Sequence, residues 1–316
     1  MAKSLESSDN VLSILSIGLV VIDIMTEVET YPVEDTKSRS NSIHERVGGN
    51  AASNSIVLSL LGEKASFMGV VGTTKHHLEL IKDTFSKYGV DYSSMIECAG
   101  HAVPQTVCII CKETGSRTCV HYRGSLPELS FSIFTGASLN FSLYKWIHFE
   151  GRYDYQDTHL SIQHCRDVKD SKGYDFKISV EIEKASAKLE RLLDSPADYI
   201  FISKDFSIMM GYADMMQAVA GFSQRVKSGV TVVCPWGSSG AAAQTNGAEA
   251  VWTPAFPPKE TVNTLGAGDT FIAACIKALC HSSSLSTAVR YACQVAGAKC
   301  GLREIDQLST LQFELE

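Results

Sequence analysis

The sequence predicts an α/β protein with a mainly parallel sheet, helices on both faces of that sheet and a small accessory sheet. From residue 145 onward, short apolar segments alternate with longer segments of helical periodicity, which is characteristic of βαβ units. Two polar, hairpin-like stretches interrupt this pattern at about 24–47 and 104–125. We expect these stretches to form a lid within a single domain that spans residues 1–316.

The elements follow from the pattern of apolar residues. In the first half we predict a buried strand at 11–22, a helix at 50–61, a strand at 65–71, a helix at 77–88 and a hairpin at 106–123 with a turn at Gly115 and Ser116. In the second half we predict strands at 146–149, 177–182, 199–202 and 230–234, and helices at 185–193, at 212–227 and after Gly268. The first two helices end at Gly62 and Gly89. We interpret His76 and His77 as a solvated helix start in preference to a metal site.

Composition narrows the class of protein. The chain has 316 residues, 45% of them hydrophobic, and a net charge of −7. It therefore predicts a globular protein and argues against nucleic acid or an anionic membrane as a partner, because both need a basic surface. The longest apolar stretch, residues 11–22, is shorter than the roughly 20 residues of a membrane span, and no basic segment with a cleavage site precedes it. We expect a cytoplasmic protein.

The ten cysteines are scattered along the chain. Cys108 and Cys111 form the one Cys-x-x-Cys pattern, but they fall in a predicted strand, where positions three apart face opposite sides. Reduced thiols that act as small apolar side chains are therefore expected.

The segment TLGAGDTF at 264–271 is the strongest functional signal. Gly266, Ala267 and Gly268 form a small-residue turn at a predicted helix start, where backbone N–H groups and the helix dipole favour an anion. Asp269 follows in the first helical turn. Phosphoryl transfer needs donors for the developing charge and a base for the attacking hydroxyl, although Asp269 as a plain helix cap is an equal alternative.

Two further features point to a ligand that is held near the backbone. Gly48 and Gly49 precede Asn50 at a predicted helix start, so they either admit a substrate or simply lead into an Asn N-cap. Asp23, at the end of the predicted first strand, either binds sugar hydroxyls or faces solvent. Because GxGxxG is absent after that strand and GxxxxGK[ST] is absent from the chain, dinucleotide and P-loop sites are disfavoured.

TLGAGDTF and GGN at 48–50 resemble the two signatures of the ribokinase (PfkB) family of carbohydrate kinases. Blocks across the chain resemble the branch of that family that phosphorylates ketohexoses: GLVVID at 18–23, YPVEDT at 31–36, VLSLLG at 57–62, WIHFEGR at 146–152, ISVEIEK at 178–184, FISKD at 201–205, AFPP at 255–258 and CQVAGAKCGL at 293–302. The resemblance implies a three-layer αβα sandwich with a lid. It also implies ATP-dependent phosphorylation of a ketohexose, typically D-fructose at its 1-hydroxyl.

The resemblance also implies roles for individual residues. Asp269 would be the catalytic base, and the amides of Gly266, Ala267 and Gly268 would form the anion hole. The sugar would be held by Asp23, Gly49, Asn50 and Ser53. The nucleotide would be held by Arg117 on the lid, by the turn of Gly237, Ser238, Ser239 and Gly240, and by Ala296, Gly297 and Cys300. Mg²⁺ would accompany the ATP, K⁺ is a possible activator, and the lids of two subunits would clasp in a homodimer.

The sequence departs from the family pattern at several positions. Ser53 stands where a second sugar-contacting Asn is usual, and Asn54 lies one step, about 100°, further around the helix. The family's NxxE motif would fall near residues 203–206, where its Glu is missing, so no magnesium ligand is named. Serines replace acidic residues in the ATP turn. A kinase for a nucleoside or another ketose, and an inactive kinase-like binding protein, remain the alternatives; the second would be expected to have lost Asp269 or the glycines.

Overall fold

The computed structural model describes residues 11–114, 116–152 and 154–315. Its strands are β1 Ser13–Ile17, β2 Val21–Val28, β3 Ser42–Gly48, β4 Ala65–Met68, β5 Val70–Gly72, β6 Ile96–Cys98, β7 Gln105–Cys111, β8 Arg117–Tyr122, β9 Tyr144–Glu150, β10 Lys177–Ile182, β11 Tyr199–Ile202, β12 Thr231–Pro235, β13 Ala241–Thr245 and β14 Val251–Thr253. Its helices are α1 Asn50–Leu60, α2 Lys75–Lys87, α3 Phe131–Gly136, α4 Tyr155–Lys172, α5 Lys204–Met209, α6 Met215–Ser223, α7 Ala267–Cys280 and α8 Leu285–Cys300. Four 3₁₀ turns complete the elements: η1 Phe141–Leu143, η2 Ala187–Asp194, η3 Gly237–Ser239 and η4 Ile305–Thr310.

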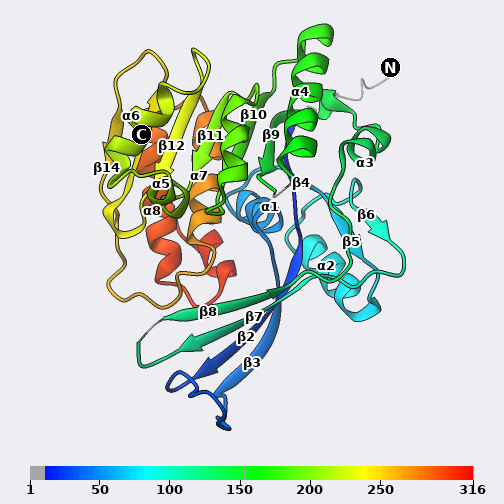
Figure 1. Ribbon diagram of the computed structural model, residues 1–316, viewed down its shortest axis with the longest axis vertical. Coiled ribbons are helices and arrows are strands. Elements are labelled where there is room, and N and C mark those ends of the chain that lie inside the picture. The colour runs from blue at the N-terminus through cyan, green and yellow to red at the C-terminus, as the bar shows by residue number, and fades with distance from the viewer. Residues whose placement is uncertain (1–10, 115, 153, 316) are drawn as a thin grey trace, which may run out of the picture.

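The main sheet has eight strands in the order β14-β13-β12-β11-β10-β9-β1-β4. All its pairs are parallel except β12 with β13 and β13 with β14. Apolar residues of α1, α7 and α8 form a core on one face, and those of α4 and α6 form a second core on the other face. Figure 1 shows the resulting three layers. The predicted three-layer sandwich with a mainly parallel sheet is confirmed.

A four-stranded sheet in the order β3-β2-β7-β8 extends away from the main body (Figure 1). We call this sheet the lid. Its β2–β7 pair is parallel, and its other two pairs are antiparallel. The hairpin predicted at 106–123 corresponds to β7 and β8, while Gly115 of its predicted turn lies outside the described residues.

The single strand predicted at residues 11–22 is wrong, because the chain leaves the main sheet after β1 and enters the lid as β2. Gly18 marks the break: a Cβ there would lie 2.6 Å from Cβ of Glu150. The strand predicted at 65–71 also divides, at Gly69, where a Cβ would lie 2.1 Å from the Gly18 carbonyl oxygen. Both breaks come from close backbone approach, which a local apolar run does not reveal.

The remaining elements agree with the periodicity, with two differences. The helix predicted at 185–193 is the 3₁₀ turn η2, and the helix predicted at 212–227 is shortened to α6. Within the described ranges, none of the helices combines the length and apolar character needed to cross a bilayer.

Candidate functional site

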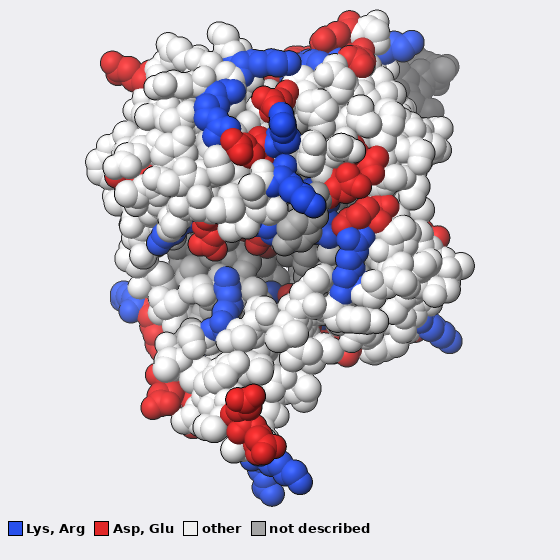
Figure 2. Space-filling view, viewed as in Figure 1, with Lys and Arg blue, Asp and Glu red and all other residues white. Residues whose placement is uncertain are grey.

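The site lies where the lid meets the main body. A cavity of about 940 Å³ is lined by lid residues, by Ser53 of α1 and by Gly266 before α7. Figure 2 shows a recess between the lid and the body, with basic and acidic side chains interleaved around it. This position, beyond the carboxyl ends of parallel strands, is where open α/β sheets bind ligands.

Asp23 lies inside β2 and not at the end of a buried strand, so its predicted placement is wrong. It is buried, at 7% exposure, which contradicts the alternative that it is a solvent residue. Arg46 of β3 donates to Asp23 Oδ2 from Nε and Nη2, each at 3.3 Å. Burial raises the pKa of Asp23, while the Arg46 charge opposes that rise. Gly48 makes room for the carboxylate, because a Cβ there would lie 2.2 Å from Oδ2.

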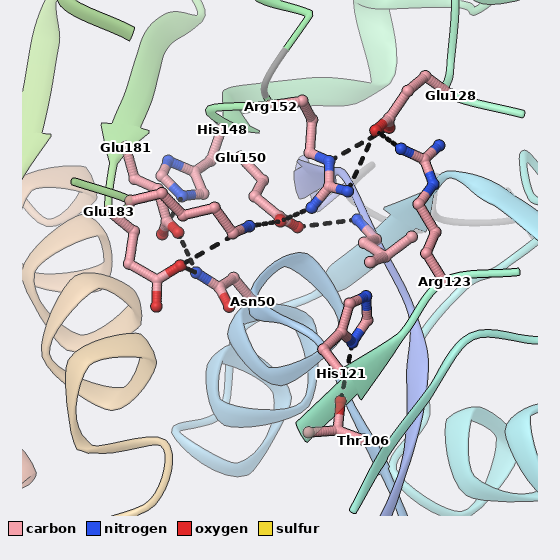
Figure 3. A network of polar contacts seen from close by, with 12 residues as sticks. Asn50, Thr106, His121, Arg123, Glu128, His148, Glu150, Arg152, Glu181 and Glu183 are labelled. Atoms are coloured by element: carbon pink, nitrogen blue, oxygen red, sulfur yellow. Dashed lines mark hydrogen bonds and ion pairs between the residues drawn. The ribbon is translucent and has the colours of Figure 1, made fainter. Parts of the chain in front are cut away.

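The strand register places Asp23, Arg46, Thr106 and His121 in one row across the lid. Paired residues of neighbouring strands share a face, so all four side chains belong to the face that carries Asp23. The His121 Nδ1 and Thr106 Oγ1 atoms are 3.0 Å apart (Figure 3). Burial lowers the pKa of His121, and the charges of Lys184, Arg152 and Arg123 lower it further. A neutral imidazole therefore faces the site.

The GGN segment starts α1. Gly49 is the N-cap with φ 94°, and a Cβ there would lie 2.5 Å from the Leu19 carbonyl oxygen, so glycine is required. Asn50 is the first helical residue, and the alternative that it is the N-cap is wrong. Its Nδ2 group donates to Glu183 Oε2 at 3.1 Å and to Glu181 Oε1 (Figure 3).

One helical turn after Asn50, Ser53 lines the cavity. The neighbouring Asn54 points away: it is fully buried, and its side-chain amide has no hydrogen-bond partner among the described residues. Of the two positions that the sequence offered for the second sugar contact, Ser53 is therefore the one that faces the cavity.

A network of ion pairs lies near Asn50 (Figure 3). Arg152 Nη1 donates to Glu150 Oε1 at 2.6 Å, and Arg152 Nε donates to Glu128 Oε2 at 3.2 Å. The Leu19 amide donates to Glu150 Oε2 at 2.8 Å. Burial alone would raise the pKa of Glu150, but the charges of Arg152 and Lys184 and this amide lower it. Glu150 therefore stays ionised and ties β9 to the turn between β1 and β2.

A second carboxyl, Glu181, lies beside His148 in the buried interior. Glu181 Oε2 and His148 Nε2 are 3.7 Å apart, and neither atom has a hydrogen-bond partner among the described residues. Burial, with the charges of Glu183 and Glu150, raises the pKa of Glu181 to about 8. Burial lowers the pKa of His148 to about 3. Both groups are thus neutral at pH 7, which makes their burial tolerable.

Asp269 is the third residue of α7 and so lies in the first helical turn, as predicted. The N-cap Gly266 has φ 79°, and a Cβ on Gly268 would meet nothing within 4 Å. Among the described residues, no hydrogen-bond partner takes the amides of Gly266, Gly268 and Asp269, whereas the Ala267 amide donates to the Thr264 carbonyl at 3.2 Å. The free amide donors at this helix start therefore belong to Gly266, Gly268 and Asp269. In the anion hole predicted from the sequence, Ala267 stood in place of Asp269.

Burial raises the pKa of Asp269 well above its ordinary value, and the nearby charges of Glu183 and Glu150 raise it further. A carboxylate with a raised pKa is a stronger base than a free aspartate. The alternative of a plain helix cap is not supported, because the N-cap of α7 is Gly266 and the helix has no side-chain cap.

Two basic residues hold the turn before α7. Lys299 of α8 is buried, and its Nζ donates to the carbonyls of Asn263, at 2.9 Å, and of Leu265. Burial lowers the pKa of Lys299 to about 8. Arg117 of the lid donates from Nη1 to Thr264 Oγ1 at 3.2 Å. The predicted lid arginine therefore contacts the predicted anion-binding segment.

Of the residues assigned to the nucleotide, Arg117 lines this cavity, whereas the turn at 237–240 and the residues of α8 do not. The turn of Gly237, Ser238, Ser239 and Gly240 joins β12 to β13. On α8, a Cβ at Gly297 would lie 1.9 Å from the Phe256 carbonyl oxygen. Gly297 therefore admits the loop at 255–258 against α8, with Ala296 and Cys300 on the same helix.

Several residues of the site were not predicted: Arg46, His121, Lys299, Glu150, Glu181 and Glu183. The segments WIHFEGR and ISVEIEK contain the three glutamates, but only the sheet brings them to Asn50 and Asp269. Arg46 gives no signal without the register that pairs it with Asp23.

Residues 11–306 match the model of the pfkB family carbohydrate kinases. The chain is 38% identical to mouse ketohexokinase over 295 residues, covering 93% of this chain and 97% of that protein. Among solved structures, it resembles a ribokinase from Giardia lamblia, with a TM-score of 0.79 and 15% identity over 94% of this chain and 96% of that one. It also resembles Arabidopsis thaliana ribokinase complexed with ribose and ATP, with a TM-score of 0.73 and 19% identity over 94% and 95%.

Proposed function

The chain belongs to the pfkB family of carbohydrate kinases, and we propose that it transfers the γ-phosphoryl group of ATP to the 1-hydroxyl of a ketohexose, D-fructose first. The observation that carries this proposal is the pairing of Asp269, with its raised pKa, with free amides at the same helix start. A base and an anion hole within one helical turn are what phosphoryl transfer to an alcohol requires.

Asp269 accepts the proton of the attacking hydroxyl. Its neighbouring carboxylates and its burial make the ionised form a better base. As the hydroxyl oxygen bonds to the γ-phosphorus, the bond from that phosphorus to the β,γ-bridging oxygen breaks and ADP leaves. The amides of Gly266 and Gly268, with that of Asp269, donate to the phosphoryl oxygens as charge develops on them.

The nucleotide is held beside the turn at 264–268, by contacts from the lid and from the main body. Arg117 reaches this turn from the lid and adds positive charge to that of Lys299. Glu183 offers an oxygen ligand of the kind that Mg²⁺ prefers, so this side chain would help to hold the ion. Bound with ATP, Mg²⁺ neutralises phosphate charge. K⁺ activation stays a prediction.

Asp23 binds the sugar from the lid side. Arg46 holds the Asp23 carboxylate by a hydrogen bond, and Gly48 leaves room for it. On the body side, Asn50 is fixed by Glu181 and Glu183 so that its amide oxygen remains to accept from a sugar hydroxyl. Ser53 completes the contact from the next turn of α1. A short Ser53 side chain leaves more room than an asparagine would, and the polar His121 faces this space.

Another ketose is the second candidate substrate, because the site would also admit it. The identity to mouse ketohexokinase over nearly the full length of both proteins favours a ketohexose, whereas the resemblance to ribokinases below 25% identity supports only the fold.

The second proposal concerns the lid face opposite Asp23. Four large apolar side chains are exposed there, Ile43, Val107, Val120 and Tyr122, at 67%, 40%, 62% and 64%. The alternation of the strands places all four on this one face. An apolar sheet face of this kind is stabilised by burial against a partner. A homodimer through the lids would bury it.

The test is a coupled assay of ADP release with D-fructose, other ketohexoses, ribose and adenosine. We expect the highest kcat/KM with D-fructose, and near-background rates for Asp269→Asn with every substrate. Turnover of ribose or adenosine without turnover of ketohexoses would contradict the substrate, and full activity of Asp269→Asn would contradict the mechanism.

A further inference from the structure

Three side chains that can bind a metal meet where the lid joins the body, at the edge of the cavity, which Glu45 helps to line. Glu45 lies on β3, and His76 and His77 lie in the first turn of α2. His76 Nε2 is 2.9 Å from Glu45 Oε2, and His77 Nε2 is 3.9 Å from Glu45 Oε1. One ligand atom from each residue lies within 4.8 Å of the other two.

The arrangement is more than a surface ion pair. Consecutive residues of a helix point about 100° apart, yet both imidazoles turn toward the same carboxylate, with ring centroids 5.4 Å apart. His76 is 72% exposed, as expected of a solvated helix start, but the side chain of His77 is only 12% exposed, so that interpretation is wrong for His77. The Nδ1 atom of His77 is buried without a hydrogen-bond partner among the described residues.

We propose that Glu45, His76 and His77 form a zinc-binding site, with water as the fourth ligand. Bond lengths of about 2.0–2.1 Å to nitrogen and oxygen place the ligand atoms of a tetrahedral zinc about 3.3–3.4 Å apart. The imidazoles approach different oxygens of Glu45, at 2.9 and 3.9 Å. One ligand atom from each residue lies within 4.8 Å of the other two, so rotation of the side chains would bring them to this spacing. Two imidazoles and one carboxylate suit Zn²⁺, whereas Mg²⁺ and Ca²⁺ prefer oxygen ligands alone.

The position of this site links the metal to the lid. Glu45 precedes Arg46, the residue that holds Asp23. A bound Zn²⁺ would join β3 of the lid to α2 of the body, so the lid strand next to the sugar site would move less. The expected readout is slower backbone hydrogen exchange in β3 when Zn²⁺ is present.

The experiment titrates the metal-free, full-length protein, without any histidine tag, with Zn²⁺ by calorimetry in excess Mg²⁺ and without nucleotide. We expect one Zn²⁺ per chain, and binding weaker by roughly tenfold or more in His77→Gln, His76→Ala and Glu45→Gln. His281→Gln is the matched control, because it removes another exposed histidine that pairs with a glutamate, Glu63 Oε1 at 2.6 Å, but has no third metal ligand among the described residues. Substitution by Co²⁺ should give the visible absorption of a tetrahedral ion.

Absence of Zn²⁺ binding, or unchanged affinity in His77→Gln, would overturn the proposal. Should His77→Gln fail to fold, the more exposed His76→Ala and Glu45→Gln decide the question in the same way. If Zn²⁺ binds but exchange in β3 stays the same, the link to the lid is contradicted. None of these readouts depends on kinase activity, so the result is independent of the proposed substrate.

Discussion

Gly48→Ala tests the proposed contact between Asp23 and the sugar by adding a single methyl group. The new Cβ would lie 2.2 Å from Asp23 Oδ2 and 2.6 Å from its Cγ. Ordinary contacts begin near 3.4 Å, so the carboxylate must move by roughly 1 Å. Gly48 does not have a positive φ, and alanine is therefore allowed by the backbone. A displacement of about 1 Å at a reacting centre can cost on the order of a hundredfold in rate.

We expect kcat/KM for D-fructose to fall by roughly ten- to a hundredfold, with little change in the KM for ATP, because Asp23 is assigned to the sugar alone. The assay varies fructose at saturating MgATP and then ATP at saturating fructose. Gly136→Ala is the matched control, since a Cβ there meets nothing within 4 Å and its φ is also not positive. If Gly48→Ala folds and keeps kcat/KM within twofold of the original protein, Asp23 does not hold the sugar.

The other predictions concern the base, the lid and the dimer. Asp269→Asn should lower kcat by about 10²–10⁴ while nucleotide binding, measured by calorimetry, stays the same; retained turnover would remove Asp269 as the base. Arg117→Ala, compared with Arg39→Ala as a control, should lower kcat/KM for ATP roughly tenfold or more through loss of a charged hydrogen bond, and an unchanged rate at saturating ATP would exclude a role in the transition state. Glu183→Gln removes a negative charge that raises the pKa of Asp269, so the acid limb of kcat/KM should move to lower pH; a limb that stays in place in a pH–rate profile would contradict this coupling. Val120→Glu should give a monomer by light scattering, while Leu160→Glu, on exposed α4, should not; a Val120→Glu protein with the original mass would contradict the lid interface.

The local pattern of the sequence was sufficient to predict the helices that carry the candidate catalytic and binding residues. Gly266, Gly268 and Asp269 form a sequence signal because a helix start needs small residues where a ligand approaches the backbone. α7 begins at Ala267, two residues before the predicted start after Gly268. The lid was predictable because its polar, alternating strands interrupt a regular α/β rhythm.

What could not be predicted depends on contacts between distant residues. The break at Gly18 arises because Glu150, more than a hundred residues later, occupies the space of a side chain. The role of Asn50 depends on Glu181, which lies 131 residues away in the sequence. Arg46 pairs with Asp23 only through the register of β2 and β3. A single sequence shows these residues but does not show which of them lie close together in the fold.

The central claim is that Asp269 activates the 1-hydroxyl of D-fructose for attack on ATP. Phosphorus NMR of the reaction of fructose with MgATP tests this claim most directly, because it identifies the carbon that carries the phosphate. The account predicts fructose 1-phosphate from the original protein and no sugar phosphate from Asp269→Asn. Phosphate on the 6-hydroxyl, or equal amounts of fructose 1-phosphate from both proteins, would contradict it.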